Sequence, residues 1–327
     1  MEGDFSEEPL HSWLAGRGIE AFFTGSAMLT GALPITKPGM HGIELLRDIP
    51  YRRSGHKAHR LDIYRPKGVT KAPVVLYIHG GGFRFLSKES HWIMGLGFAR
   101  KGYLVVAINY RLAPRHPFPA ALVDSCNALG WIHKEIEKYG GDKNHIIVAG
   151  ESAGANLALN LAMGSAYPYQ EAWMQRVYQL PQPKAAIVSC GILQVSSPER
   201  YIEKLQVPRW IYHRVEEVGR AYLRDSSFEK RRSPLLADPL VFLEGKANFS
   251  RDLPPIFAPV GTADPLVDDT QRLERALQYR QLPHEVRYYP GENHAFHAFV
   301  FRKQARQCWG DTYRFLETYA PYRLNES

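Results

Sequence analysis

The chain has 327 residues, of which 45% are hydrophobic, and a formal net charge of +8 at pH 7. This length and composition allow one large core or two modest ones, and they exclude a fibrous or disordered chain. Basic and acidic residues are interleaved, and the densest basic run is only Lys230 to Arg232, so a solvated surface is favoured over a nucleic-acid-binding patch.

The first 42 residues precede any regular pattern of strands. Residues 1–13 are acidic and polar, which is not typical of a secretory signal. Residues 21–33 are apolar but too few to span a bilayer, which takes about 20 residues. We expect this segment to form a helix lying on a hydrophobic surface, with no integral membrane insertion, and residues 1–42 to form part of a cap.

From residue 43 onward, strand-like and helix-like segments alternate. Eight segments rich in Val, Ile and Tyr are predicted strands: 43–52, 59–66, 73–80, 103–110, 145–152, 184–190, 254–261 and 284–290. The first two alternate polar and apolar residues, whereas several later ones are continuous apolar runs, as in strands covered on both faces. The alternation predicts an α/β fold with a mostly parallel sheet flanked by helices.

Helical patterns separate these strands. Apolar residues recur at helical spacing in 118–140 and 265–280, and the segment 153–164 is rich in Ala and Leu. Residues 192–250 interrupt the alternation, with helical spacing in 208–225. We expect this insertion to complete the cap, over a core made of 43–191 and 251–327.

The three cysteines, Cys126, Cys190 and Cys308, are far apart in the sequence. Their odd number argues against a disulfide framework or a zinc knuckle, and it indicates a reducing compartment, the cytoplasm. No His, Cys and Asp residues stand at metal-ligand spacing in the sequence, so neither a metal nor an organic cofactor is expected.

The stretch GESAG, residues 150–154, has the pattern G-x-S-x-G between a predicted strand and a predicted helix. A serine on such a tight turn needs small neighbours two positions either side, and it is lifted out of the end of the sheet. This context favours Ser152 as a nucleophile. The alternative is a structural serine that caps a helix.

The stretch HGGGF, residues 79–83, ends the third predicted strand. Consecutive glycines let backbone N–H groups approach a ligand closely, as the oxyanion of an acyl-transfer reaction requires. We assign the N–H groups of Gly81, Gly82 and Ala153 to such an oxyanion hole. The alternatives are a flexible loop or a phosphate-binding turn, although neither common phosphate motif matches.

A serine nucleophile needs a histidine base and a carboxylate that orients it. Asp264 follows the seventh predicted strand directly, whereas Asp268 and Asp269 fall in the first turn of the next helix, where the helix dipole accounts for them. His294 falls on the loop after the eighth strand. His297 falls in the first turn of the final predicted helix, 295–319, where packing or solvent exposure is expected and lining the site is the alternative.

Six motifs in order resemble the hormone-sensitive-lipase-like esterases, the bacterial family IV carboxylesterases of the α/β-hydrolase superfamily. The motifs are HGGGF, NYRLAPRHPFPAALVD, GESAGANLAL, SPLLAD, LPPIFAPVGTADPLVDD and YPGENHAF. The resemblance implies an eight-stranded α/β-hydrolase core, a helical cap, and hydrolysis of short- to medium-chain acyl esters. It also implies a triad of Ser152, Asp264 and His294, with Gly81, Gly82 and Ala153 as the oxyanion hole.

Two positions depart from the family pattern: Glu151 stands where Asp is usual, and Ala155 stands where a further Gly is usual. The loop around Tyr110 and Arg111 is expected to be mainly structural. The remaining alternatives are an amide, formamide or lactone hydrolase, or a non-catalytic binder, on the same fold. The expected partner is a small-molecule ester, not nucleic acid, and homo-oligomerisation is left open.

Overall fold

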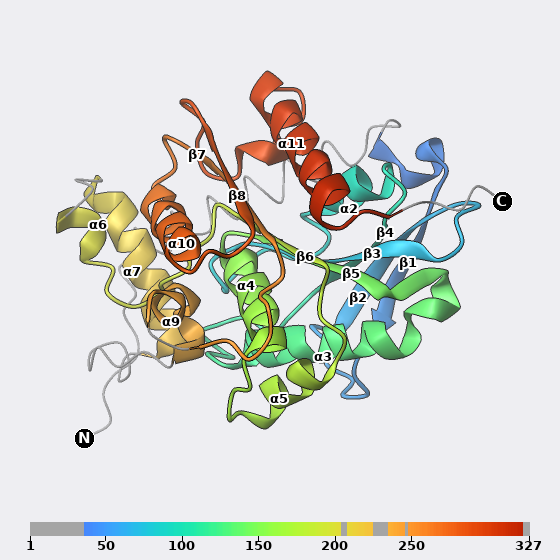
Figure 1. Cartoon of the computed structure of the whole chain (residues 1–327), viewed down its shortest axis with the longest axis horizontal. Coiled ribbons are helices and arrows are strands. Elements are labelled where there is room, and N and C mark those ends of the chain that lie inside the picture. Colours follow the sequence, from blue (N-terminus) through green and yellow to red (C-terminus); the bar gives the residue numbers. More distant parts are fainter. Residues whose placement is uncertain (1–35, 204–207, 225–234, 246–247, 323–327) are drawn as a thin grey trace.

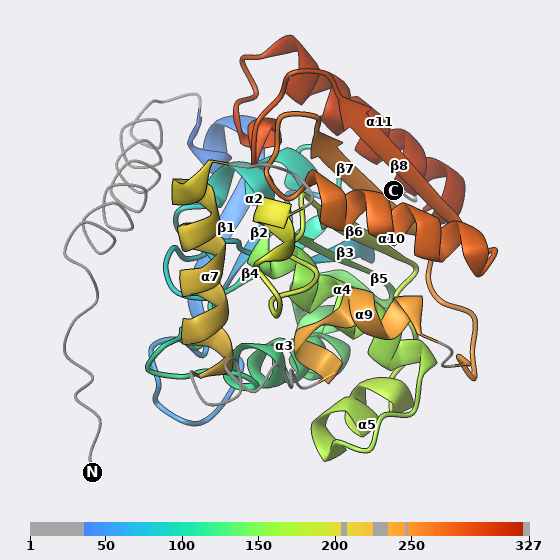
Figure 2. The same cartoon turned by 90° about the vertical axis from the view of Figure 1, so that its left-hand side faces the viewer.

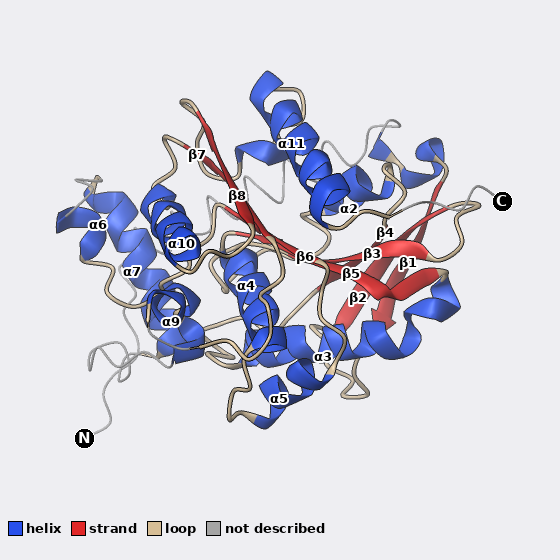
Figure 3. Cartoon of the chain, in the orientation of Figure 1, coloured by secondary structure: helices blue, strands red, loops and turns tan. Residues whose placement is uncertain are grey.

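One eight-stranded sheet organises the molecule (Figures 1 and 3). The computed structural model describes residues 36–203, 208–224, 235–245 and 248–322. The strands lie in the order β1-β2-β4-β3-β5-β6-β7-β8. Their bounds are β1 Ile43–Pro50, β2 Arg60–Pro66, β3 Ala72–Ile78, β4 Leu104–Ile108, β5 Gly141–Glu151, β6 Ala185–Ser189, β7 Ile256–Gly261 and β8 His284–Tyr289.

The sheet is mostly parallel, as the sequence predicts. Strand β2 runs antiparallel to both β1 and β4, and every adjacent pair in the remaining order β4-β3-β5-β6-β7-β8 is parallel. Each of the eight predicted strands overlaps one of these observed strands, so all eight are confirmed. Because parallel strands end on the same edge, the segments after β3, β5, β6, β7 and β8 meet at one end of the sheet.

Helices cover both faces of the sheet (Figure 1). The α-helices are α2 Trp92–Ala99, α3 Ala120–Glu135, α4 Ala153–Ala166, α5 Ala172–Gln179, α6 Arg200–Glu203, α7 Arg209–Leu223, α9 Pro239–Glu244, α10 Val267–Tyr279 and α11 Lys303–Tyr319. In the described ranges the short 3₁₀ helices are η2 Pro38–His41, η3 Ile136–Tyr139, η4 Leu235–Ala237 and η5 Phe296–Ala298. Among the described residues, no helix is both long and apolar enough to cross a membrane.

Strand β3 shows why its sequence is continuously apolar. Val74, Leu76 and Ile78 belong to the core that contains α3 and α4, whereas Val75 and Tyr77 belong to the core that contains α2 and α11. Successive side chains of a strand point to opposite faces, so a strand covered by helices on both sides needs apolar residues at every position.

The final predicted helix begins later than expected. Residues 296–298 form the separate 3₁₀ helix η5, and α11 starts only at Lys303. Ala295, before η5, is left-handed at φ 56°, and Phe296 packs against Tyr289 at a ring-centroid distance of 4.9 Å. This packing folds 296–298 back onto the end of β8, so the placement of His297 in the first turn of the final helix is wrong.

The insertion between β6 and β7 carries α6, α7, η4 and α9, of which α7 and α9 are labelled in Figure 2. Helix α7 confirms the helical pattern predicted at 208–225. Its Tyr222 stacks on Phe83 at 3.7 Å between ring centroids, so α7 packs against the segment that follows β3. The division into cap and core stays a prediction, and the helix predicted at 21–33 lies outside the described residues.

Candidate active site

Ser152 lies on a strained turn between β5 and α4. Its backbone has φ 53° and ψ −117°, a conformation that costs a non-glycine residue on the order of 1–3 kcal/mol. No side-chain hydrogen bond from Ser152 caps α4. The hydroxyl is therefore not used as a helix cap, and the strain points to a functional turn instead.

The two glycines of the motif make this turn sterically feasible. A Cβ on Gly150 would lie 2.3 Å from the carbonyl oxygen of Gly154, and a Cβ on Gly154 would lie 2.0 Å from the carbonyl oxygen of Ile78. Both clashes are with backbone atoms that cannot rotate away. The requirement for small residues predicted from the sequence thus has a direct cause in the packing of the turn.

Gly154→Ala is expected to destabilise the protein by about 1–3 kcal/mol or more, because the methyl group overpacks against the end of β3. Gly130→Ala in α3 is the matched control. A Cβ on Gly130 would meet nothing within 4 Å. Alanine inside a helix is more stable than glycine by about 1 kcal/mol. Urea unfolding of both variants measures the contrast, and equal stability of the two would contradict this steric account.

Asp264 and His294 are in direct contact at the ends of β7 and β8. His294 Nδ1 lies 2.9 Å from Asp264 Oδ2 and 3.1 Å from Oδ1. The backbone N–H of Leu266 donates to Asp264 Oδ1 over 2.8 Å, which fixes the carboxylate. Burial lowers the pKa of His294, but the charge and hydrogen bonding of Asp264 outweigh it and raise the pKa above its ordinary value.

Cys190, just after β6, lies between the Ser152 turn and the His294 loop. Its thiol lies close to the backbone amides of Ala295 and Ser152. Burial, the largest cause, and the charges of Asp264 and Glu151 raise the pKa of this thiol well above its ordinary value, and the two amides only partly offset them. The backbone N–H of Ser152 also donates to the carbonyl oxygen of Ser189 over 2.9 Å. The serine turn and the aspartate–histidine pair therefore share one neighbourhood.

A possible metal-ligand set, which the sequence did not predict, arises here. Ligand atoms of Cys190, Asp264 and His294 all lie within 4.8 Å of one another. The three residues come from three strand ends, so no sequence spacing could indicate the set. A thiol binds metal as the thiolate, and the raised pKa of Cys190 opposes that form. The cluster fits an acid–base pair beside a neutral thiol better than a cation site.

The glycine loop after β3 presents unpaired backbone donors. Gly81 and Gly82 have φ 105° and 57°, and a Cβ on Gly81 would lie 2.1 Å from the carbonyl oxygen of Phe85. In the described part of the chain, no residue accepts a hydrogen bond from the backbone N–H of Gly81, Gly82 or Ala153. These three groups, assigned together from the sequence, therefore have no acceptor among the described residues.

The loop that follows β4 packs against the start of the glycine loop. Tyr110 stacks on His79 at 4.3 Å between ring centroids, and its hydroxyl donates to the carbonyl oxygen of His79 over 3.0 Å. The guanidinium of Arg111 donates two hydrogen bonds to the buried Asp124, at 2.8 and 2.9 Å. Both residues therefore have the structural role expected of them, and Tyr110 in particular anchors the start of the glycine loop.

His297 and Asp269, which the sequence placed outside the triad, make more specific contacts than the sequence indicated. His297 is 7% exposed, and its Nε2 lies 2.9 Å from Glu151 Oε2, so of the two expected environments it has the packed one and not the solvent-exposed one. Asp269 is fully buried, pairs with Arg200 at 2.8 Å and accepts the backbone N–H of Leu193 over 2.8 Å. The helix dipole alone does not explain Asp269, which ties the start of the insertion to α10.

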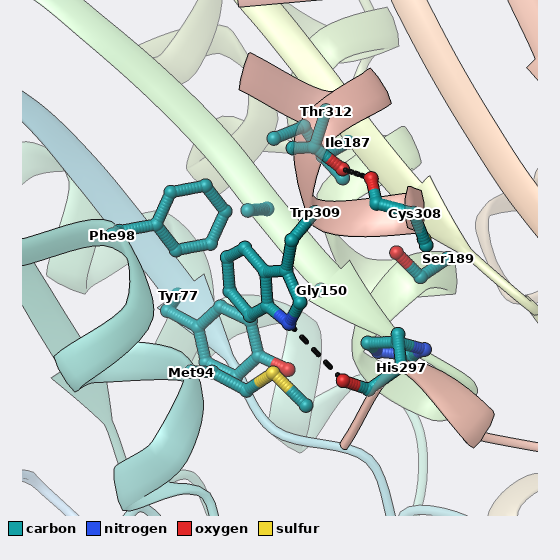
Figure 4. A pocket seen from close by; sticks show the side chains of 11 residues that line it. Tyr77, Met94, Phe98, Gly150, Ile187, Ser189, His297, Cys308, Trp309 and Thr312 are labelled. Atoms are coloured by element: carbon teal, nitrogen blue, oxygen red, sulfur yellow. Dashed lines mark hydrogen bonds between the residues drawn. The ribbon is translucent and has the colours of Figure 1, made fainter. Parts of the chain in front are cut away.

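A small cavity lies on the far side of the serine turn, between the sheet and helices α2 and α11. Its volume is about 20 Å³, room for about one water molecule and too little for an ester. Figure 4 shows His297 beside it, with Trp309 Nε1 donating to the carbonyl oxygen of His297 over 3.1 Å. This cavity is therefore part of the packing beneath η5 and not a substrate pocket.

The chain is similar to a known family and to known esterases. A family model described as alpha/beta hydrolase fold matches residues 75–298. An acetyl esterase of Salmonella typhi is 29% identical over 239 residues, covering 72% of this chain and 68% of the relative. Esterase LipI of Mycobacterium tuberculosis is 30% identical over 227 residues, covering 66% of this chain and 63% of the relative.

Solved structures of esterases share the fold. A hyperthermophilic esterase from the archaeon Pyrobaculum calidifontis superposes with a TM-score of 0.74 at 24% identity, covering 96% of this chain and 99% of that one. Esterase LipW of Mycobacterium marinum gives a TM-score of 0.76 at 24% identity, covering 97% and 92%. At this identity the likeness supports the architecture of sheet and flanking helices.

Proposed function

This chain belongs to the α/β-hydrolase fold family, and we propose that it is a carboxylic-ester hydrolase that works through Ser152, His294 and Asp264. The observation that carries the proposal is the 2.9 Å contact between His294 Nδ1 and Asp264 Oδ2, at the sheet edge where Ser152 sits on a strained turn. The esterase relatives support the same reaction class.

Each residue of the proposed triad has its own role. Asp264 accepts the Nδ1 proton of His294, which leaves Nε2 free to take the proton of the Ser152 hydroxyl. The serine oxygen then attacks the ester carbonyl, and His294 returns the proton to the leaving alcohol. Water activated by the same imidazole hydrolyses the acyl-enzyme and regenerates Ser152.

The unpaired N–H groups of Gly81, Gly82 and Ala153 are the proposed oxyanion hole. They flank the serine from the end of β3 and the start of α4, and each lacks a described protein acceptor. Donors that are already in place stabilise the negative charge as it develops on the carbonyl oxygen, and loss of one such donor costs about 10²–10³-fold in kcat.

The proposed substrates are small esters with short to medium acyl chains. The acetyl esterase relatives support the short end of this range. The three cysteines are buried, which agrees with a reducing compartment, and the cytoplasm stays the proposed location. Cap boundaries at 1–42 and 192–250 also stay part of the proposal, supported by the packing of α7 on the glycine loop.

The purified protein is expected to hydrolyse p-nitrophenyl acetate and butyrate faster than the octanoate, with turnover of p-nitroacetanilide at least about 10²-fold lower than that of p-nitrophenyl acetate, because an anilide has a much poorer leaving group. Initial rates across this matched series, read from the released chromophore, make the measurement. Comparable turnover of the ester and the anilide would instead assign the protein to amide hydrolysis, and a chain-length optimum at octanoate or beyond would overturn the size assignment.

A further inference from the structure

A buried carboxylate beside the nucleophile contacts two histidines that have no role in the triad. Glu151 is 6% exposed, His91 is 5% exposed and His297 is 7% exposed. Glu151 Oε1 lies 2.8 Å from His91 Nε2, and Glu151 Oε2 lies 2.9 Å from His297 Nε2. Each carboxylate oxygen thus faces one imidazole, away from bulk water.

Each histidine belongs to a segment that carries part of the proposed machinery. His91 follows the glycine loop and immediately precedes α2, and its Nδ1 lies 3.1 Å from the carbonyl oxygen of Ser87. His297 lies in η5, three residues after His294, and its carbonyl oxygen accepts a hydrogen bond from Trp309. Glu151 itself directly precedes Ser152, so one side chain joins three segments.

Glu151 also fills the space beside Gly80, at the start of the glycine loop. A Cβ on Gly80 would lie 3.3 Å from Glu151 Oε1 and 3.1 Å from the carbonyl oxygen of Glu151. The backbone that leads to the proposed donors Gly81 and Gly82 therefore rests against the Glu151 side chain. A shift of that side chain would be transmitted to the glycine loop and, through His297, to the segment of His294.

The electrostatics show that Glu151 is ionised. Burial raises its pKa, but the nearby imidazoles of His91 and His297 outweigh burial and hold the pKa well below its ordinary value. The charge of Glu151 adds to that of Asp264 in raising the pKa of His294 against the opposing effect of burial. An ionised Glu151 therefore favours the imidazolium form of His294.

Other titratable groups surround Glu151 from β3 and from the segments after β3, β4 and β6, and they are neutral near pH 7. Burial lowers the pKa of His79 to about 3 and raises the pKa of the remaining three groups well above neutrality. The four groups are Tyr77, His79, Tyr110 and Cys190. The charges that raise the pKa of His294 are those of Asp264 and Glu151.

We propose that Glu151 is a positioning residue. Through its contacts with His91 and His297, it holds the glycine loop and the His294 loop in place around Ser152. This role rests on the proposed ester hydrolysis, because it concerns the same serine, base and backbone donors. The Glu151 carboxylate acts on them through neighbouring residues, without itself touching the ester.

Glu151→Gln is expected to slow fluorophosphonate labelling of Ser152 by about 10²-fold, the order of loss that follows a misplacement near 1 Å. The labelling rate rises with pH as His294 loses its proton. We call this rise in rate at low pH the acid limb of the profile. Removal of the Glu151 charge lowers the pKa of His294, so the acid limb should move to lower pH. Labelling rates from pH 5 to 9, together with kcat and KM for p-nitrophenyl acetate, make the measurement.

Two further variants separate positioning from general destabilisation. Glu151→Asp keeps the charge and should return the acid limb close to that of the wild type, with only part of the rate. Glu292→Gln removes another buried carboxylate, which pairs with Arg302 at 3.0 Å, and it should leave the acid limb unchanged. An acid limb that does not move in Glu151→Gln, or that moves equally in Glu292→Gln, would overturn the proposal.

The labelling assay also separates this proposal from the proposed substrate. If Ser152 of the wild type reacts with the fluorophosphonate but no ester is hydrolysed, the ester assignment fails while the effect of Glu151→Gln still decides the positioning role. If Ser152 of the wild type does not react at all, both proposals fail. Circular dichroism of each variant establishes that the comparison is made on folded protein.

Discussion

Ser152→Ala is expected to lower kcat for p-nitrophenyl butyrate by about 10⁶-fold, the scale seen when the nucleophile of a serine hydrolase is removed. The loss follows because no acyl-enzyme can form, and the proposed oxyanion donors and Asp264–His294 pair have no serine oxygen to act on. Steady-state kinetics at high enzyme concentration, with burst analysis of the wild type, measure the difference.

The same substitution should leave stability almost unchanged. Ser152 makes no side-chain capping bond to α4, whereas loss of a real cap costs about 0.5–2 kcal/mol. Alanine also bears the same Cβ as serine at φ 53°, so the strain of the turn is retained. A variant that keeps its activity would eliminate Ser152 as the nucleophile, and a large fall in Tm would restore the structural interpretation of this serine.

Local sequence patterns predicted much of the fold because they depend on neighbouring residues. The apolar run of β3 reflects burial on both faces, and the spacing of Gly150 and Gly154 reflects backbone atoms that pass within van der Waals contact of the turn. The strand end after β7 was enough to separate Asp264 from Asp268. Such features are encoded within short stretches of neighbouring residues.

Other features depend on contacts between distant segments, and they could not be predicted in this way. Helix α2 is apolar around most of its circumference, so it shows no helical period in its sequence WIMGLGFA. The burial of His297 is set by Glu151, which is remote in the sequence, and by Trp309. Cys190 comes near Asp264 and His294 only because three parallel strands end at one edge.

The departure of Glu151 from the usual family residue gains a physical explanation from these contacts. Glutamate is one methylene longer than aspartate, and here its two oxygens reach His91 and His297 at 2.8 and 2.9 Å. A shorter side chain on the same backbone cannot make both contacts without moving one of the two segments. The length of the Glu151 side chain therefore fits the separation of His91 and His297 in this structure.

His294→Ala is expected to reduce kcat/KM by about 10⁴-fold or more, because it removes the base that accepts the proton of Ser152. His297→Ala should cost only about 10-fold to 10²-fold, since it loosens the contact of η5 with Glu151 without removing a proton acceptor. The two residues stand in identical local sequence, His-Ala-Phe, so the pair is a matched comparison. Assays of both variants on p-nitrophenyl butyrate, with Tm as a check on folding, give the ratio.

The structural basis of this difference is the partner that each imidazole has. His294 faces Asp264, whose other contact is a backbone amide, and this arrangement leaves Nε2 available for proton transfer. In His297 it is Nε2 that faces Glu151, at 2.9 Å, so the nitrogen equivalent to the working one is already engaged. A larger loss in His297→Ala than in His294→Ala would mean that the Asp264 contact does not identify the base, and the assignment of the triad would have to be abandoned.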